Sequence, residues 1–182
     1  MKQSIWIALI CGVVTLCGCS AEKAPEQQQE IPAFTLSPSE KEELTAFYKE
    51  LLSFEGIADK AVKLAGDEVK NVIKGGGGSI TLTSIIDKAK NECLLAGEAL
   101  VKKSVPEALP PEMKRLLNEG KTGLAAAYAA HAESFEAIKS FVADKSPMAL
   151  LEYRKKSAQA QELYSGATDK FKKIMTAAGL SQ

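Results

Sequence analysis

This chain of 182 residues is poor in several of the features that specific functions require. Its 23 basic residues are balanced by 23 acidic ones, so no strongly basic surface is available to bind nucleic acid. Histidine occurs once, at His131. No segment alternates long enough to predict a strand, because the one alternating patch, at 79–83, is short. The remaining composition, 46% hydrophobic and 25% charged, is that of a single folded domain.

The first 18 residues have the features of a signal peptide. Lys2 supplies the positive start, and an apolar run extends from Ile5 to Leu16. This run is too short to remain in a bilayer as a spanning helix. It ends in Leu16-Cys17-Gly18-Cys19, which resembles the bacterial lipobox, a leucine followed by two small residues and a cysteine. An ordinary secretory signal with incidental cysteines is the alternative.

The resemblance to the lipobox implies a lipid anchor on the mature protein. Residues 1–18 would be removed, and Cys19 would carry diacylglycerol, with palmitate-type acyl chains holding the protein on a membrane of the cell envelope. Ser20 follows Cys19. Since aspartate at this place commonly favours the inner membrane of Gram-negative bacteria, its absence favours the outer membrane, facing the periplasm, if the source is Gram-negative.

The remaining cysteines permit no disulfide in the mature domain. Cys11 and Cys17 belong to the segment that we expect to be cleaved, and Cys19 would be occupied by lipid, so Cys93 is left alone. Its place in an apolar helical stripe predicts a small buried side chain. Residues 19–36 contain Pro25 and several glutamines without apolar periodicity, and they predict a flexible tether.

Residues 37–182 predict an all-α domain of four long helices. Ser37-Pro38-Ser39-Glu40 combines an N-cap, a first-turn proline and a capping-box glutamate. The remaining boundaries are marked by Gly75–Gly78, Thr81 or Thr83, Pro106, Pro110-Pro111, Ser146-Pro147 and Gly179. Because the breaks between the helices are short, we expect antiparallel neighbours in an up-down-up-down bundle.

Apolar residues at alternating steps of three and four define the side of each helix that should face the core. Gly120 and Gly123 weaken the early turns of the third helix. The four stripes are Leu44, Phe47, Leu51, Phe54, Ala58, Ala61 and Ala65; Leu82, Ile86, Ala89, Cys93, Ala96 and Leu100; Met113, Leu117, Leu124, Tyr128, His131, Phe135, Ile138 and Val142; and Leu150, Tyr153, Ser157, Ala160, Tyr164, Ala167, Phe171, Ile174 and Ala178.

His131 is the candidate for a binding role, and its main interpretation is structural. We expect a histidine at the edge of the core, hydrogen-bonded to a carbonyl or to a tyrosine on a facing helix. The Glu-x-x-His motif of bundle metal sites is absent, because Tyr128 stands three residues earlier. Cys93 could meet His131 across two helices, but no third residue is indicated to orient the pair. The sequence therefore predicts no catalytic residue, no metal site and no cofactor.

Two functions fit these features. The first is a lipid-anchored, non-enzymatic protein of the cell envelope with a structural or protein-interaction role, bound to a protein partner or to copies of itself. The second is a periplasmic binding module that holds a small apolar ligand, a haem or a metal ion in the bundle core near His131. An anchor, a tether and long helices without a catalytic constellation favour the first.

Overall fold

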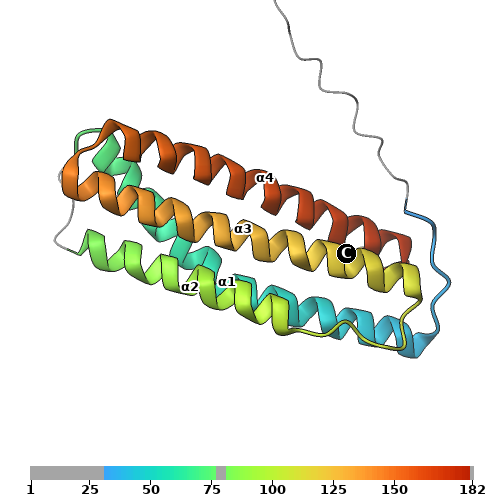
Figure 1. Ribbon diagram of the computed structural model, residues 1–182. Helices are drawn as coiled ribbons and strands as arrows, with labels where there is room; N and C mark the ends of the chain where they lie inside the picture. The colour runs from blue at the N-terminus through green and yellow to red at the C-terminus, as the bar shows by residue number, and fades with distance from the viewer. Residues whose placement is uncertain (1–30, 77–80, 181–182) are drawn as a thin grey trace, which may run out of the picture. The chain divides into compact units, whose positions relative to one another are not determined.

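A computed structural model describes residues 31–76 and 81–180, and within these ranges every regular element is a helix. Figure 1 shows that successive helices run in opposite directions, so the topology is up-down-up-down. The predicted all-α antiparallel four-helix bundle is confirmed. The helices are α1 (Pro38–Ile73), α2 (Leu82–Lys102), α3 (Pro111–Asp144) and α4 (Pro147–Ala177).

The helix starts follow the capping signals in the sequence. The Glu40 N–H donates to the Ser37 Oγ at 3.3 Å, and the Ser37 N–H donates to Glu40 Oε2 at 2.7 Å. This capping box satisfies two of the amide groups that a helix start leaves without partners. Pro111 and Pro147 begin α3 and α4, where the fixed φ of proline suits the first turn and its missing N–H has no cost. Thr81 occupies the N-cap position of α2.

Most of the predicted core stripe is buried. All six stripe residues of α2, from Leu82 to Leu100, are buried. In α1 and α3 the exceptions are half-buried side chains at the edge of the stripe: Phe54, Ala61, His131 and Val142. The periodicity therefore predicted correctly which side of these three helices faces the core.

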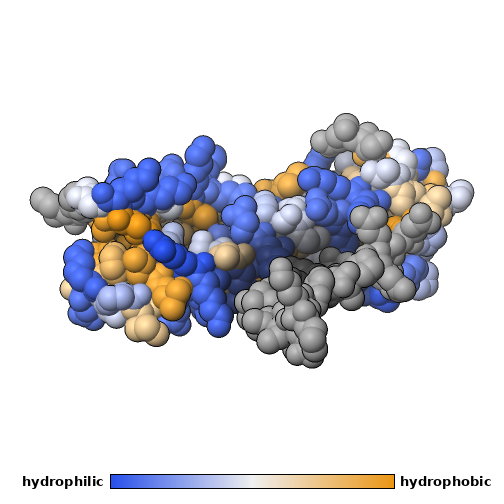
Figure 2. All heavy atoms as spheres, turned by 90° about the horizontal axis from the view of Figure 1, so that it is seen from above, coloured by the Kyte–Doolittle hydropathy of each residue, from blue (hydrophilic) through white to orange (hydrophobic). Residues whose placement is uncertain are grey.

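The first half of α4 differs from this pattern. The sequence predicts an inward stripe from Leu150 onward, but the buried residues of α4 begin at Ala160, and Tyr153 is half-buried. The helix pairs with extensive contact are α1–α2, α2–α3 and α3–α4, so the first half of α4 has α3 as its main neighbour. Met148 and Leu151 remain exposed. Figure 2 shows hydrophobic surface at the end of the bundle where α4 begins.

The compact unit begins before the boundary expected from the sequence. The sequence predicts a polar tether over residues 19–36, but the compact unit starts at Ile31. Leu36 is buried, and the Phe34 N–H donates to the Ala177 carbonyl at 2.9 Å. Residues 31–36 are too short a segment for a periodic signal, yet buried Leu36 and the partly buried side chains of Ile31 and Phe34 pack against the core and hold the segment on the bundle. Residues 19–30 lie outside the described part of the chain.

A non-helical segment, 103–110, completes the bundle beyond the end of the short helix α2. Figure 1 shows the chain continuing from α2 toward the start of α3 without a helix. Val105 and Leu109 are buried there. The ammonium group of Lys121, on α3, donates to the carbonyls of Val101 and Lys103. Lys121 is itself buried, and it supplies positive charge and donors where the end of α2 leaves carbonyls without partners.

Two glycines let α3 and α4 approach closely. A Cβ atom at Gly120 would lie 2.9 Å from Phe171 Cε2, and one at Gly123 would lie 3.1 Å from the Ala167 Cβ. Both distances are shorter than comfortable carbon–carbon contacts. The glycines that weaken the helix signal in the sequence are therefore the positions where the α3–α4 interface has no space for a side chain.

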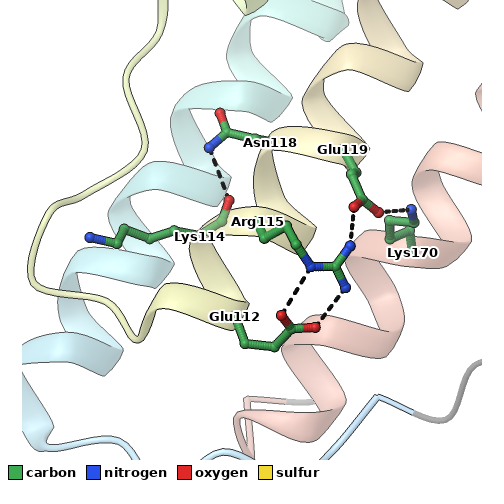
Figure 3. Close-up of polar contacts among 6 residues, drawn as sticks. All are labelled: Glu112, Lys114, Arg115, Asn118, Glu119 and Lys170. Atoms are coloured by element: carbon green, nitrogen blue, oxygen red, sulfur yellow. Dashed lines mark hydrogen bonds and ion pairs between the residues drawn. The ribbon is translucent and has the colours of Figure 1, made fainter.

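An ion-pair network joins the same two helices on the surface (Figure 3). Arg115 binds both carboxylate oxygens of Glu112, at 2.9 and 2.6 Å, and also pairs with Glu119. Lys170 of α4 reaches Glu119 at 2.7 Å. The groups are half-exposed, so the network fixes orientation more than it adds stability.

Candidate functional site

A polar cluster lies where α1, α3 and α4 meet. The hydroxyl of Tyr128, on α3, donates to Asp59 Oδ1, on α1, at 2.8 Å. The hydroxyl of Tyr164, on α4, lies 3.1 Å from Glu55 Oε2 and 3.4 Å from Asp59 Oδ2. Two carboxyl groups one helical turn apart thus face two tyrosines from different helices, and the tyrosine rings pack edge to face at 6.3 Å.

Burial controls the ionisation of Glu55, Tyr128 and Tyr164 in this cluster. Glu55 is only 5% exposed. Desolvation raises its pKa to about 7, the hydrogen bond from Tyr164 opposes this rise, and the negative charge of Asp59 adds to it. The pKa values of Tyr128 and Tyr164 are also raised, mainly by burial and also by the neighbouring carboxyl groups. Both hydroxyls therefore keep their protons near neutral pH and act as donors.

Cys93 lies in the core of α2 as the sequence predicted, and it is fully buried. Desolvation, with smaller contributions from the charges of Asp59 and Glu92, raises the pKa of its thiol to about 12. Since the thiolate is the reactive form of cysteine, this environment disfavours a nucleophilic role. Cys93 behaves as a small apolar side chain in the α2 seam.

His131 is placed at the edge of the core, but the expected hydrogen bond is wrong. None of the hydrogen bonds within residues 31–76 and 81–180 involves the His131 ring. The ring stacks instead on Phe135, one turn further along α3, with centroids 6.4 Å apart and an interplanar angle of 24°. Burial lowers the pKa of His131, and the charge of Asp59 opposes this effect. The imidazole is therefore mainly neutral at pH 7.

The candidate metal ligands do not assemble into a site in the described part of the chain. No group of three His, Cys, Asp or Glu side chains there could hold a metal ion. Asp59 influences the pKa values of both Cys93 and His131, so the cluster connects these two residues electrostatically without bringing them together as ligands. The lipid-attachment candidate, Cys19, lies outside the described residues.

Sequence reasoning missed the two carboxyl groups at the centre of the cluster. Glu55 follows Leu51 by four residues, and Asp59 follows Glu55 by four, so both lie along the edge of the α1 stripe. A glutamate in that position is usually solvated, and no local pattern around Glu55 indicates that Tyr164 of another helix lies against it. The available signal was the coincidence of acidic residues at the edge of one stripe with tyrosines in two others.

Two apolar grooves run along the sides of α2. The first lies between α1 and α2 and has a volume of about 270 Å³. The second lies between α2 and α3 and has a volume of about 320 Å³. Ile57 and Leu64 line the first, Leu94 and Val101 line the second, and all four side chains are exposed. Lys60, Lys88 and Glu92 flank the first groove, and Glu98 and Lys102 flank the second.

The fold and these features define an all-α four-helix bundle with two apolar grooves beside its shortest helix and one polar cluster, in which Glu55 and Tyr128 are buried, Tyr164 is half-buried and Asp59 is exposed. Within the described residues, no helix has the length and apolar character needed to span a membrane. Comparison with protein-family models, curated proteins and solved structures finds no match to this chain. The functional argument therefore depends on the residues of the chain itself.

Proposed function

We propose that this protein is a lipid-anchored, non-enzymatic protein of the cell envelope that binds a protein partner through the grooves beside α2. The observation that carries this proposal is the exposure of large apolar side chains in both grooves. Leu64 is 54% exposed and Val101 is 65% exposed. Burying one such side chain contributes about 1.5–3 kcal/mol, and contiguous exposed apolar surface is typical of interaction sites.

The flanking charges suit a protein partner. Both grooves carry lysine and glutamate at their edges, and a polar rim around an apolar centre is the usual anatomy of a protein interface. The buried thiol of Cys93 and the neutral His131 favour a binding role over a catalytic one, since neither side chain is activated for chemistry. The partner is either a different protein or a second copy of this chain.

Attachment to the membrane is tested at the cysteines. In cells grown with labelled palmitate, the wild-type chain should incorporate label and fractionate with the membrane, and on this account with the outer membrane if the source is Gram-negative. Cys19→Ala should abolish both properties, because it removes the sulfur that carries the acyl chains. Cys11→Ala is the matched control and should retain them. Labelling that persists in Cys19→Ala would overturn the anchor.

Partner binding is tested by placing a charge in each groove. Leu64→Glu and Val101→Glu should leave the fold intact, because both side chains are largely exposed. Each should reduce the size of the complex that the full chain forms when the cell envelope is solubilised in mild detergent. Leu151→Glu is the control, since Leu151 is 59% exposed but lies on α4.

The masses of the solubilised species decide among the outcomes. A wild-type complex that becomes smaller only in the groove variants supports the proposal, and a mass at a whole multiple of the chain identifies the partner as a second copy. A monomeric wild type contradicts it. A complex that Leu151→Glu disrupts while both groove variants preserve it would move the docking surface to α4, and the grooves would have no role.

A further inference from the structure

The contact between α1 and α4 depends on a small number of groups. All three pairs of consecutive helices pack extensively, whereas the first and last helices, α1 and α4, do not. The links between them include the rings of Tyr48 and Phe171, which are tilted by 36° with centroids 5.9 Å apart, and the contact of the Tyr164 hydroxyl with Glu55 and Asp59. The first buried residue of α4 is Ala160. The Tyr164 contact therefore lies close to the place where α1 and α4 separate.

The hydroxyls of Tyr128 and Tyr164 supply two hydrogens for three close oxygen–oxygen contacts. A third hydrogen is present only if one carboxyl group is protonated. Tyr164 has one hydroxyl hydrogen, yet it lies within reach of a Glu55 oxygen and an Asp59 oxygen. If Glu55 is protonated, its carboxyl O–H donates to the Tyr164 oxygen, and Tyr164 donates to Asp59. Tyr128 donates to the other oxygen of Asp59. Each of these three O–H groups then has its own acceptor oxygen.

Ionisation of Glu55 breaks this arrangement. Two carboxylates then compete for the single hydrogen of Tyr164, and they repel each other across one turn of α1. No ion pair within the described ranges supplies either carboxylate with a cation. The other ionisable groups facing the cluster are Cys93 on α2, and Tyr128 and His131 on α3. None of these is cationic at neutral pH, so ionised Glu55 would have no positive charge beside it and would keep only the hydrogen bond from Tyr164.

We propose that Glu55, Tyr164 and Asp59 form a proton-operated latch that holds α1 against α4 and loosens when Glu55 loses its proton. The proposal is independent of the grooves beside α2. The pH range in which the latch responds follows from the desolvation that raises the pKa of Glu55 from 4.5 to about 7 in the closed bundle. Since the closed state holds the extra proton, the latch is strongest below pH 4.5 and loses strength as the pH rises to 7.

Hydrogen exchange of the full chain, measured by mass spectrometry at pH 5 and pH 8, tests the latch. After correction for intrinsic exchange, opening of the seam should be roughly 70-fold more favourable at pH 8, if Glu55 recovers its ordinary pKa on opening. The loss of protection should be concentrated in residues 52–66 of α1 and 147–164 of α4. Peptides from the α2–α3 interface are the internal reference and should respond much less.

Two variants separate the latch from a general effect of pH. Glu55→Gln should abolish the pH dependence, because the amide remains neutral throughout the range and can still donate to Tyr164. Glu50→Gln is the matched control on the same helix and should keep the wild-type response, because Glu50 is partly exposed and pairs with Lys103.

The outcomes are distinct. Loss of protection that spreads equally over all four helices, or an unchanged response in Glu55→Gln, would overturn the latch. If Glu55→Gln does not fold, direct titration of the Glu55 carboxyl carbon by NMR in the wild-type chain decides the question. A midpoint near pH 7 supports the latch, and a midpoint near 4.5 refutes it.

Discussion

The substitution Gly120→Ala tests the close packing of α3 and α4. The added methyl carbon would lie 2.9, 3.0 and 3.3 Å from three ring atoms of Phe171. That ring is only 2% exposed and packs against Tyr48. It therefore cannot rotate away without disturbing the α1–α4 contact. Forcing an additional carbon into a packed core costs about 1–3 kcal/mol.

An opposing effect must be considered in the same variant. Alanine is favoured over glycine inside a helix by about 1 kcal/mol, so the net change at Gly120 is a destabilisation of roughly 0–2 kcal/mol. Gly66→Ala isolates the helix preference, because a Cβ at Gly66 meets no atom within 4 Å. We expect this control to be stabilised by up to about 1 kcal/mol.

Urea unfolding of the two variants gives the comparison directly. Gly120→Ala should be less stable than Gly66→Ala by about 1–3 kcal/mol, the overpacking term alone. Adding Phe171→Leu, which shortens the opposing side chain, should recover part of the loss specifically in the Gly120→Ala background. If Gly120→Ala is stabilised as much as Gly66→Ala, the contact between α3 and α4 is looser than described and the packing argument fails.

Three further predictions address other parts of the bundle. Lys121→Met should lower the free energy of unfolding by about 1–3 kcal/mol, because it keeps the aliphatic stem but leaves carbonyls at the end of α2 without a donor. Lys121→Arg should lower the free energy of unfolding by less. Equal losses for the two variants in a urea titration would contradict a role for the charge. In the native protein at pH 8, iodoacetamide should alkylate Cys93 far more slowly than in urea, as peptide mass spectrometry can show, and rapid native labelling would disprove its burial. Ser37→Ala should destabilise the bundle by about 0.5–2 kcal/mol and Ser37→Gly by only a few tenths, whereas thermal unfolding with the same midpoint in all three proteins would show that the cap has no effect on stability.

Sequence periodicity predicts the inward side of a helix, but it cannot show whether a neighbouring helix is present there. In α2 the stripe from Leu82 to Leu100 is buried throughout, because α1 and α3 flank the whole helix. In α4 the same kind of stripe is only half-buried over Leu150 and Tyr153, because α1 and α4 do not pack closely. The spacing of apolar residues along a helix thus predicts which side of the helix faces inward, but it does not predict the distances between helices.

The residues of the candidate site differ in the same way: the surroundings of some follow from local spacing, and those of others depend on distant helices. The burial of Cys93 follows directly from its position in the stripe. The cluster around Glu55 does not, since its properties depend on Tyr128 and Tyr164, which are more than 65 residues away along the chain. Gly120 and Gly123 are a third case. The low helix preference of glycine is visible in the sequence, but the packing role of these two residues depends on Phe171 and Ala167 of another helix.

The central claim, that the sides of α2 bind a partner, is tested most directly by crosslinking in cells. A photoreactive amino acid at Val101 should produce one defined crosslinked species, and Leu94→Glu in the same groove should abolish it. The same probe at Glu162, an exposed position on α4, should not produce this species. If Val101 yields no specific product, or if both positions yield the same product, the grooves beside α2 are not the docking surface and the proposed function is wrong.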